Sequence, residues 1–399
     1  MLAFHNKSVT KLEETDVVVI GAGPAGCTAA RKLAQAGHSV LIVDKRQELG
    51  APIQCSGAVS RHALIENDID PDPEFIHEAV YGFKIMNGKG DETPIDYRKL
   101  KPETYGTGEG RNPLGYVVDR RRFDRYLYTR AQRAGAEAWL KAEALGYEKS
   151  GHDVVVSISH FGEVKRVKTK VIVGADGLRS QVGKWAGLQT HIKITELASC
   201  LQLIVDGVET DGLLELITGR QTAPGGYGWV FPKGHGYAEV GLGIIAPYTK
   251  RTAQQHLDDF IKKSFLSHRF RKAKILEVQG GGVPLAAPLK RQYADNLILT
   301  GDAARHVNPI TGGGIHTALS GGMVAGQFII DHFHENSTHE ARRMAGYQDA
   351  WLEAVGNQMW KLYKVKRDIF NINDLERQDE MLYDTMRNYF SPDSEFKKV

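Results

Sequence analysis

The stretch DVVVIGAGPAG, residues 16–26, decides the fold. A run of valine and isoleucine followed directly by glycines is typical of a buried strand that ends in a tight turn. The next residues, CTAARKLAQAG, have the alanine-rich pattern of a helix that ends at Gly37, and HSVLIVDKR then supplies a second buried strand. A strand, a helix and a strand within about 30 residues make a βαβ unit, which predicts a parallel sheet with a right-handed crossover.

Each glycine of the turn has its own task in a dinucleotide site. Gly21 permits the tight turn, Gly23 lets a pyrophosphate approach the backbone, and Gly26 allows the helix to pack close to the strand. The unpaired N–H groups at the start of the helix favour phosphate. Asp44 ends the second strand 23 residues after Gly21, where an acidic residue usually binds ribose hydroxyls. The strand, helix and strand context argues against the alternative of a plain turn.

Two later motifs point to a flavin. GADGLRS, residues 174–180, follows a strand-like run and contains Asp176, although an Asp-Gly pair alone is most often a simple turn. TGDAAR, residues 300–305, places Asp302 at a strand end, where its carboxylate can accept hydrogen bonds from a polyol. The glycines at 312–314 then open a long helix, whose free amides suit the electron-rich edge of a flavin ring. Three motifs in this order favour FAD.

The composition is that of an ordinary globular protein and excludes several classes. The 51 Lys and Arg against 48 Asp and Glu leave a net charge of +3, which gives no broad field for capturing nucleic acid. Cys27, Cys55 and Cys200 lack CxxC spacing, so neither a disulfide framework nor a metal site is predicted. The sequence has no signal-peptide pattern and no apolar run of about 20 residues. We expect a cytoplasmic protein, with membrane association open only as a peripheral contact on the cytoplasmic face.

The remaining patterns divide the chain into interleaved regions. A helix is expected to begin near Asp119, and residues 151–175 form a predicted hairpin with its turn at Phe161-Gly162. Residues 191–289 carry short strand-like runs separated by glycines, which is typical of an antiparallel sheet. The last segment has apolar residues three or four apart and is predicted to be helical.

The predicted fold is therefore of the α/β (α+β) class, with two interleaved domains and a helical tail. Its parts are a Rossmann-type FAD-binding domain with a parallel sheet (residues 14–80, 112–190 and 290–340), an antiparallel-sheet substrate-binding domain (81–111 and 191–289) and a C-terminal helical segment (341–399).

Taken together, these motifs resemble the FAD-dependent family that includes p-hydroxybenzoate hydroxylase, and within it most closely the geranylgeranyl reductases. The broad resemblance is carried by GAGPAG, GADGLRS and GDAARHVNPITGGG. The narrower one is carried by GAPIQC at 50–55, YVVDRRRFDRYL at 116–127 and YGWVFPK at 227–233, the last being similar to the YxWxFPK signature of prenyl reductases. The resemblance covers about residues 15–335.

The resemblance implies FAD contacts along most of the first domain. The pyrophosphate is expected at Ala25 and Gly26, the ribose at Asp44 and the adenine at the backbone of Ala144. Arg120, in the RxxFD pattern, is expected near the phosphates or the ribityl chain. The full set of expected cofactor-binding residues is Gly21, Gly23, Ala25, Gly26, Asp44, Cys55, Ser56, Arg120, Ala144, Asp176, Asp302, Gly312, Gly313, Gly314 and Ile315.

Cys55 is the expected catalytic residue, because its segment lines the flavin in such reductases. Many members continue as Cys-Gly-Glu where this chain has Cys55-Ser56-Gly57, which leaves the chemistry beside Cys55 open. The alternative for a free cysteine is a small buried hydrophobic residue. His306 lies in the same loop as Asp302, but a lone loop histidine is more often structural.

Tyr227, Trp229 and Phe231 are the expected substrate residues. Trp229 and Phe231 alternate with Val230 in a strand-like run, so they point to one face of the sheet. The resemblance implies that this face walls a prenyl tunnel, whereas aromatic residues in strands are otherwise usually core. The helical tail can dock on a lipid surface or, more commonly for such a pattern, pack against the protein.

The resemblance implies an FAD-dependent reductase that saturates C=C bonds of geranylgeranyl chains on archaeal-type membrane lipid precursors. The expected partners are a prenyl lipid and a reduced electron donor, for which NADPH and a ferredoxin-like protein both remain open. An aromatic hydroxylase, a halogenase or a quinone-linked dehydrogenase on the same fold is the alternative enzyme, and a non-catalytic flavin- or lipid-binding protein is the alternative outside enzymes.

Overall fold

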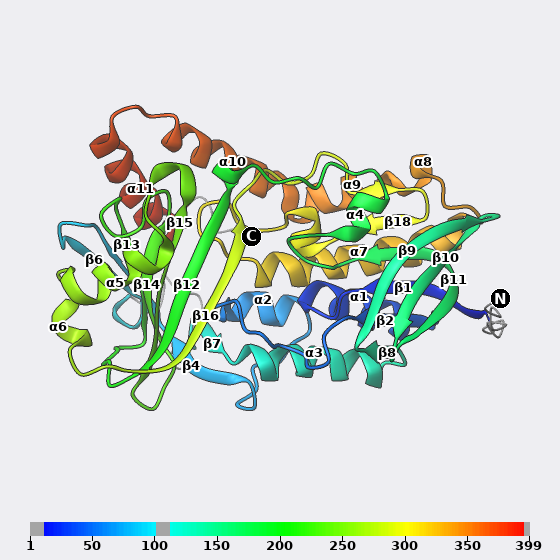
Figure 1. Cartoon of the computed structure of the whole chain (residues 1–399), viewed down its shortest axis with the longest axis horizontal. Coiled ribbons are helices and arrows are strands. Elements are labelled where there is room, and N and C mark those ends of the chain that lie inside the picture. The colour runs from blue at the N-terminus through cyan, green and yellow to red at the C-terminus, as the bar shows by residue number, and fades with distance from the viewer. Residues whose placement is uncertain (1–11, 101–111, 395–399) are drawn as a thin grey trace, which may run out of the picture.

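The computed structural model describes residues 12–100 and 112–394, so the parts of the predicted domains at 101–111 and 395–399 lie outside the described residues. One sheet lies at each end of the long axis, with a layer of helices beside the first and along the middle (Figure 1). The functional question is therefore what lies between the two sheets.

The first sheet is parallel at its centre, as the βαβ pattern predicts. Its order is β17-β18-β11-β1-β2-β8, and β1 pairs in parallel with both β2 and β11 because its last residues, Val17 to Ile20, are buried between them. Strands β9 and β10 extend β11 as antiparallel hairpin strands, with the predicted turn at Phe161-Gly162. The bounds are β1 Glu13–Ile20, β2 Val40–Asp44, β8 Glu137–Leu140, β9 Ala142–Ser150, β10 Asp153–His160, β11 Glu163–Gly174, β17 Tyr293–Ala294 and β18 Leu297–Leu299.

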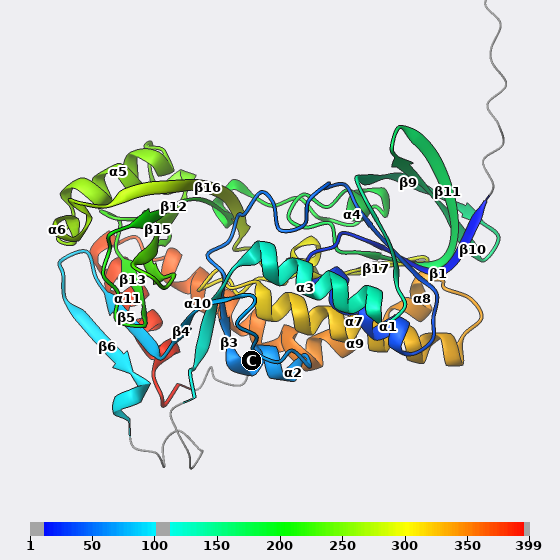
Figure 2. The same cartoon turned by 90° about the horizontal axis from the view of Figure 1, so that it is seen from below.

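Helices α1 (Pro24–Gln35), α3 (Arg120–Arg133) and α7 (Ile315–Glu335) lie side by side along the first sheet (Figure 2). Asp119 caps α3 as predicted, because its side chain accepts hydrogen bonds from the backbone N–H groups of Arg121 and Arg122. Helices α1 and α7 approach closely: a Cβ added to Gly322 of α7 would lie 2.4 Å from the Ala25 carbonyl oxygen. The start of α1 therefore packs directly against the body of α7.

The second sheet has the order β16-β12-β15-β14-β13-β5-β6. Its neighbours are antiparallel, as predicted for this domain, except for β13 and β5, which pair in parallel. The reason is that β5 comes from a distant part of the chain rather than from a hairpin. The bounds are β5 Gly82–Met86, β6 Glu92–Asp96, β12 Leu197–Asp206, β13 Leu213–Thr218, β14 Tyr227–Pro232, β15 Tyr237–Ile245 and β16 Lys274–Pro284.

Smaller elements complete the body. A three-stranded sheet forms between residues 58 and 118, inside the ranges assigned to the FAD-binding domain, and helices α5 and α6 cover one face of the second sheet through Leu257, Phe260 and Phe270. The bounds are β3 Ala58–Ser60, β4 Ile76–Val80, β7 Gly115–Val118, α2 Arg61–Glu66, α4 Gln181–Trp185, α5 Ala253–Lys263 and α6 Ser267–Phe270.

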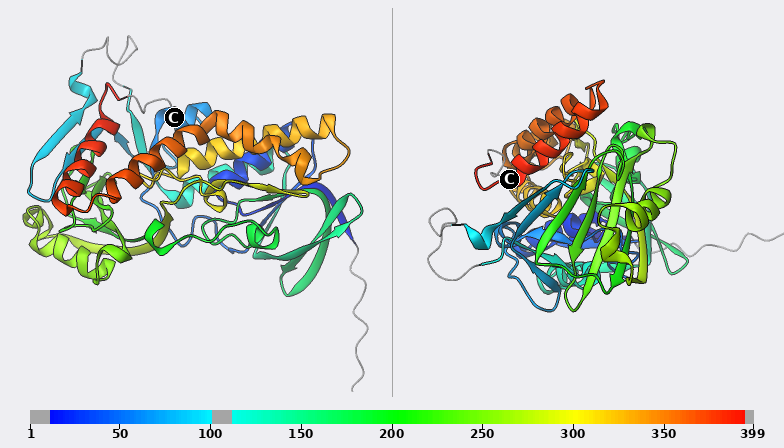
Figure 3. Two further views of the ribbon diagram at one scale, coloured as in Figure 1. Left: turned by 90° about the horizontal axis from the view of Figure 1, so that it is seen from above. Right: turned by 90° about the vertical axis from the view of Figure 1, so that its left-hand side faces the viewer.

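The C-terminal helices run along the body from the first sheet's helices towards the second sheet (Figure 3). Trp351, Val355, Met359 and Leu362, which form the apolar stripe predicted from the sequence, are buried in the main core. The tail therefore packs against the protein along this stripe. Its elements are α8 Ala341–Met344, α9 Gly346–Trp351, a π-helical turn Leu352–Gly356, α10 Asn357–Phe370 and α11 Leu375–Phe390. None of the helices in the described residues is both long and apolar enough to span a bilayer.

Candidate functional site

A cavity of about 1550 Å³ extends from the glycine loop after β1 to the second sheet. Its wall includes Gly23 and Asp44 at one end and Trp229 and Phe231 at the other, so it joins the two sheets. Ligand pockets usually measure about 300–1,000 Å³, and this cavity has room for a dinucleotide and a second molecule.

The three glycines of the loop differ in what surrounds them. A Cβ on Gly21 would lie 2.2 Å from the Ala175 carbonyl oxygen, and one on Gly26 would lie 1.9 Å from the Gly21 carbonyl oxygen. A Cβ on Gly23 would meet nothing within 4 Å, and Gly23 lines the cavity. Gly21 and Gly26 therefore allow tight packing, while Gly23 leaves open space above the start of α1. Gly26 does not line the cavity, so its surroundings support the packing role, and its predicted cofactor contact stays a prediction.

Asp44 lines the cavity where the second strand ends, but it is already bound by Arg46. The Arg46 Nε and Nη2 atoms lie 2.9 and 2.8 Å from the two carboxylate oxygens, and the Ala22 N–H donates to Oδ2 at 2.7 Å. Burial raises the pKa of Asp44, but the hydrogen bonds and charge of Arg46 and the backbone donors outweigh it and lower the pKa below its ordinary value. The carboxylate is therefore ionised, and a ribose would share it with Arg46.

Asp176 and Asp302 bring two further carboxylates to the cavity wall. Asp176 Oδ2 accepts hydrogen bonds from the backbone N–H groups of Gln181 and Val182, so it holds the start of α4, while its buried Oδ1 has no partner among the described residues. Burial raises the pKa of Asp302 to about 6, against the opposing charge of Arg120. Both side chains have acceptor capacity that a ligand in the cavity can use.

Arg120 carries a positive charge into the middle of the cavity. Its guanidinium binds Asp124 at 3.0 and 3.2 Å, and the Asp124 side chain is only 2% exposed. Burial lowers the pKa of Arg120, but Asp124 and the nearby Cys55 more than compensate and raise it. The arginine therefore stays charged between the Cys55 loop and the glycine loop.

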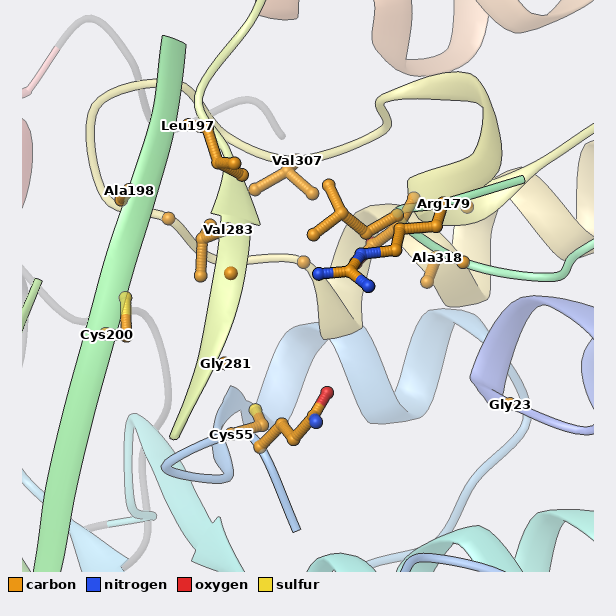
Figure 4. Close-up of a pocket in the computed structure, with 18 of the residues that line it drawn as sticks. Gly23, Cys55, Arg179, Leu197, Ala198, Cys200, Gly281, Val283, Val307 and Ala318 are labelled. Carbon is orange, nitrogen blue, oxygen red and sulfur yellow. The ribbon is translucent and has the colours of Figure 1, made fainter. Parts of the chain in front are cut away.

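A side chain of the second sheet binds the backbone of the Cys55 loop. Lys233 Nζ donates to the Ser56 carbonyl at 3.2 Å and pairs with Glu239 at 2.9 Å, and both charged side chains are almost completely buried. Cys55 and Cys200 border the same part of the cavity (Figure 4), and burial, followed by the proximity of Cys55, raises the pKa of the Cys200 thiol to about 12. Lys233 thus holds the backbone of the residue that follows Cys55.

The opposite wall contains the predicted aromatic residues. Tyr227, Trp229 and Phe231 line the cavity, whereas Val230 packs on the other face of the sheet with Val240. The hydroxyl of the partly buried Tyr227 donates to the Thr311 carbonyl, which directly precedes the glycine run. The second sheet is thereby tied to the loop that begins α7.

The glycine run before α7 contributes only in part. Gly312, Gly314 and Ile315 line the cavity, but Gly313 does not. Gly313 is exposed and its N–H donates to Thr311 Oγ1, while its carbonyl accepts from Asn308, so it shapes the turn instead of facing the predicted ligand. The remaining predicted residues, Ala25, Ser56 and Ala144, are all in the wall.

His306 is structural, as its position in a loop suggested. It is fully buried, stacks on Trp351 with ring centroids 4.2 Å apart and hydrogen-bonds Gln292. Burial lowers its pKa to about 3, so it stays neutral.

Comparison with known proteins shows to which family this chain belongs. Residues 196–283 match the model of the geranylgeranyl reductase catalytic domain, and residues 16–84 match an FAD binding domain. The digeranylgeranylglycerophospholipid reductase of Methanothrix thermoacetophila is 37% identical over 361 residues, which are 90% of this chain and 88% of that protein. Digeranylgeranylglycerophospholipid reductase 1 of Methanothermobacter thermautotrophicus is 35% identical over 98% of this chain and 94% of its own. The chain belongs to the geranylgeranyl reductase family.

Solved structures agree with the reductase assignment. A geranylgeranyl bacteriochlorophyll reductase-like protein from Thermoplasma acidophilum superposes with a TM-score of 0.85 and 31% identity, covering 98% of this chain and 94% of the other. The halogenase PltM in complex with FAD superposes with a TM-score of 0.67 at 15% identity, covering 92% of this chain and 86% of the other, which shows a shared fold alone. The chain is therefore an FAD-dependent oxidoreductase of the geranylgeranyl reductase family.

The residues present fit FAD. The open space over Gly23 accepts a group that approaches the backbone. Elsewhere in the cavity wall, the buried Oδ1 of Asp176 has no partner among the described residues and can accept a hydrogen bond from a donor group of the cofactor. The free N–H groups at the start of α1 favour a pyrophosphate there.

Several residues of the reductase site were missed by sequence reasoning. Arg46 follows Asp44 by two positions and carried a usable signal, because a basic residue in the same turn is placed to pair with the acid. The C-terminal helices supply Lys366, Phe370 and Leu382 to the wall, and no local pattern marks them. Their position depends on how the tail folds back over the body.

Proposed function

We propose that this protein saturates the C=C bonds of geranylgeranyl chains on an archaeal-type membrane lipid precursor, the activity for which its digeranylgeranylglycerophospholipid reductase relatives are named. One observation carries the proposal. A single cavity links the glycine loop at Gly23 with the aromatic wall at Trp229 and Phe231. A flavin and a long apolar chain can therefore meet in one space.

FAD supplies the hydride when it is bound and reduced. We place its pyrophosphate at Gly23 and Ala25, its ribose at Asp44 and its ring at Gly312, Gly314 and Ile315. These side chains and backbone groups border one continuous wall. The remaining contacts that we propose are Cys55, Ser56, Arg120, Ala144, Asp176 and Asp302.

The protein itself contributes by positioning the lipid chain and by excluding water. An isolated alkene has no carbonyl group that an active site could polarise, so catalysis depends on holding the chain against the cofactor and on excluding water. Trp229 and Phe231 present apolar surface to the chain, and both are less than 8% exposed. Cys55 Sγ is the proton-bearing atom that we place at the alkene, since it lies in the wall beside the buried Arg120.

The electron donor and the membrane contact belong to the same proposal. A reduced nicotinamide and a ferredoxin-like protein are both compatible donors, and each can be supplied separately to the anaerobic assay in place of a chemical reductant. The substrate lies in a membrane, so we propose a peripheral contact of the protein with the bilayer surface. The division of the chain into an FAD-binding and a substrate-binding domain also remains a prediction.

The test is anaerobic. The purified protein is reduced, supplied with digeranylgeranylglyceryl phosphate, and the lipid is analysed by mass spectrometry for products heavier by pairs of hydrogens. Trp229→Ala, which opens the cavity wall, should lower the yield strongly. Val230→Ala, on the opposite face of the same strand, is the matched control and should reduce it little. Unchanged lipid in the presence of fully reduced flavin would reject the proposal, and oxygen uptake with a phenol would favour a hydroxylase.

A further inference from the structure

Lys366 of α10 is a buried lysine inside the cavity. The residue is 5% exposed, and its side chain reaches the cavity wall. Its ammonium group donates a hydrogen bond to the Leu285 carbonyl. No carboxylate in residues 12–100 and 112–394 forms an ion pair with it. A lysine ammonium carries three N–H donors, so donors remain for a further acceptor.

The negative charge near Lys366 is shared with a second cation. Glu196 is the nearby acid, but it also faces Arg305, and the Tyr363 hydroxyl donates to its Oε1 at 2.6 Å. Burial lowers the pKa of Lys366 to about 8, and Glu196 opposes this only in part. A buried lysine that lacks a full counter-charge destabilises the fold relative to an apolar side chain. A charged lysine at this buried position indicates that an anion binds the Lys366 ammonium group.

Lys366 lies just inside an opening of the cavity. The Leu285 N–H donates to the Glu196 carbonyl at 2.8 Å, which places Lys366 against the 3-10 turn Ile194–Glu196. Ile194 lines the cavity and is 63% exposed, so the cavity reaches the surface at this turn. Phe370, one turn further along α10, lines the same end. The wall of the opening thus contains both apolar side chains and the Lys366 cation.

We propose that Lys366 binds the phosphate of the lipid headgroup. This inference rests on the proposed function, because it names the contact for the polar end of the same substrate. A prenyl lipid that enters tail first leaves its phosphate at the opening. The apolar side chains there accept the start of the prenyl chains, and the ammonium group forms charge-assisted hydrogen bonds with the phosphate oxygens.

The experiment measures binding without turnover. The oxidised holoenzyme is titrated with digeranylgeranylglyceryl phosphate and with the uncharged digeranylgeranylglycerol, each diluted in neutral detergent micelles, and intrinsic tryptophan fluorescence reports occupancy. The wild type should bind the phosphate lipid more tightly than the uncharged lipid. Lys366→Met should weaken binding of the phosphate lipid by roughly 10- to 100-fold and leave the uncharged lipid within about twofold. Lys364→Met, on the exposed face of α10, should change neither.

The outcomes separate the possibilities. Equal losses for both lipids in Lys366→Met, or no preference in the wild type, would overturn the proposal. Inorganic phosphate should compete only weakly, since it lacks the prenyl chains; tight, Lys366-dependent binding of inorganic phosphate with no gain from the lipid would overturn the headgroup assignment. Binding that depends on Lys366 in a protein that reduces no lipid would reject the proposed function while keeping this site.

Discussion

The two ends of the cavity, which we propose hold the cofactor and the lipid and which we call the cofactor end and the lipid end, are built from different kinds of residue. At the cofactor end, Gly21, Gly23 and Gly26 shape the site by what they lack, because added side chains would overlap backbone or fill the open space. At the lipid end, the wall is made of large side chains from several elements, and buried charges such as Lys233 and Glu239 hold it together. Adding atoms at the glycines should therefore disrupt the cofactor end. Removing a large side chain or one partner of a buried ion pair should disrupt the lipid end.

The largest effect is expected from Gly21→Ala. Gly21 has φ +110°, and its new Cβ would lie 2.2 Å from the Ala175 carbonyl oxygen in the neighbouring strand end. Backbone strain and overpacking together should lower the free energy of unfolding by about 4 kcal/mol. Gly37→Ala is the matched control, because Gly37 also has a positive φ of +86° but its Cβ would meet nothing within 4 Å, and it should cost only about 1 kcal/mol. Urea unfolding of both variants measures the difference, and equal losses would remove the role of the close approach.

Next in size is Lys233→Met at the lipid end. The substitution leaves Glu239, whose side chain is fully buried, without its cation and should lower the free energy of unfolding by about 3 kcal/mol. The double variant Lys233→Met/Glu239→Met removes both charges and should recover most of this loss. If the double variant were as unstable as the single one, the lysine would act through something other than its charge.

The double variant also separates stability from position. It still lacks the donor that holds the Ser56 carbonyl, so the Cys55 loop should loosen. Alkylation at neutral pH reports chiefly on Cys55, because Cys27 is buried and the Cys200 pKa is about 12. We expect severalfold faster alkylation in a protein that is otherwise folded. An unchanged rate would mean that Lys233 does not position the loop.

The same contrast between the two ends of the cavity determines how much of each could be predicted from the sequence. The cofactor end depends on residues that are close together in the chain, so the separate tasks of Gly21 and Gly23 were predicted from spacing alone and match the surroundings that the structure shows. Asp44 was predicted to bind the cofactor and does line the cavity, but its pairing with Arg46 was missed. Gly313 was predicted to bind the cofactor but does not line the cavity, because a run of three glycines does not show which of them turns away from the cavity.

The lipid end could be predicted only where a strand pattern applied. The alternation of Trp229 with Val230 gave the correct face of the sheet. Lys366 and Leu382 come from helices far along the chain, and their arrival at the cavity depends on long-range packing rather than on a local motif. The parallel pairing of β5 with β13 was missed for the same reason.

Gly23→Ala is expected to have a smaller effect, raising the stability of the cofactor-free protein but lowering its affinity for FAD. The Gly23 backbone has φ −83°, which alanine adopts without strain, and its Cβ would meet no protein atom within 4 Å. The cofactor-free protein should therefore gain about 0.5 kcal/mol of stability. The methyl group would occupy the space proposed for the pyrophosphate, so FAD affinity should fall about 100-fold, or about 2.7 kcal/mol. Unaltered FAD affinity in a flavin titration would place the pyrophosphate elsewhere.

The smallest effect compares two carboxylates of the cofactor end by their pH dependence. Burial raises the pKa of Asp302 to about 6, so between pH 4 and 6 the folded cofactor-free protein binds more protons than the unfolded chain. Stability that is present at pH 4 should be lost as the pH rises through 6, by up to about 2 kcal/mol, because water in the cavity screens part of the shift. Asp302→Asn should abolish this loss. Asp44 has a lowered pKa, so its contribution should be present above pH 4 and disappear only at lower pH. Urea midpoints of the cofactor-free protein across this range test both, and a pH dependence that Asp302→Asn leaves intact would show that Asp302 already has a polar partner.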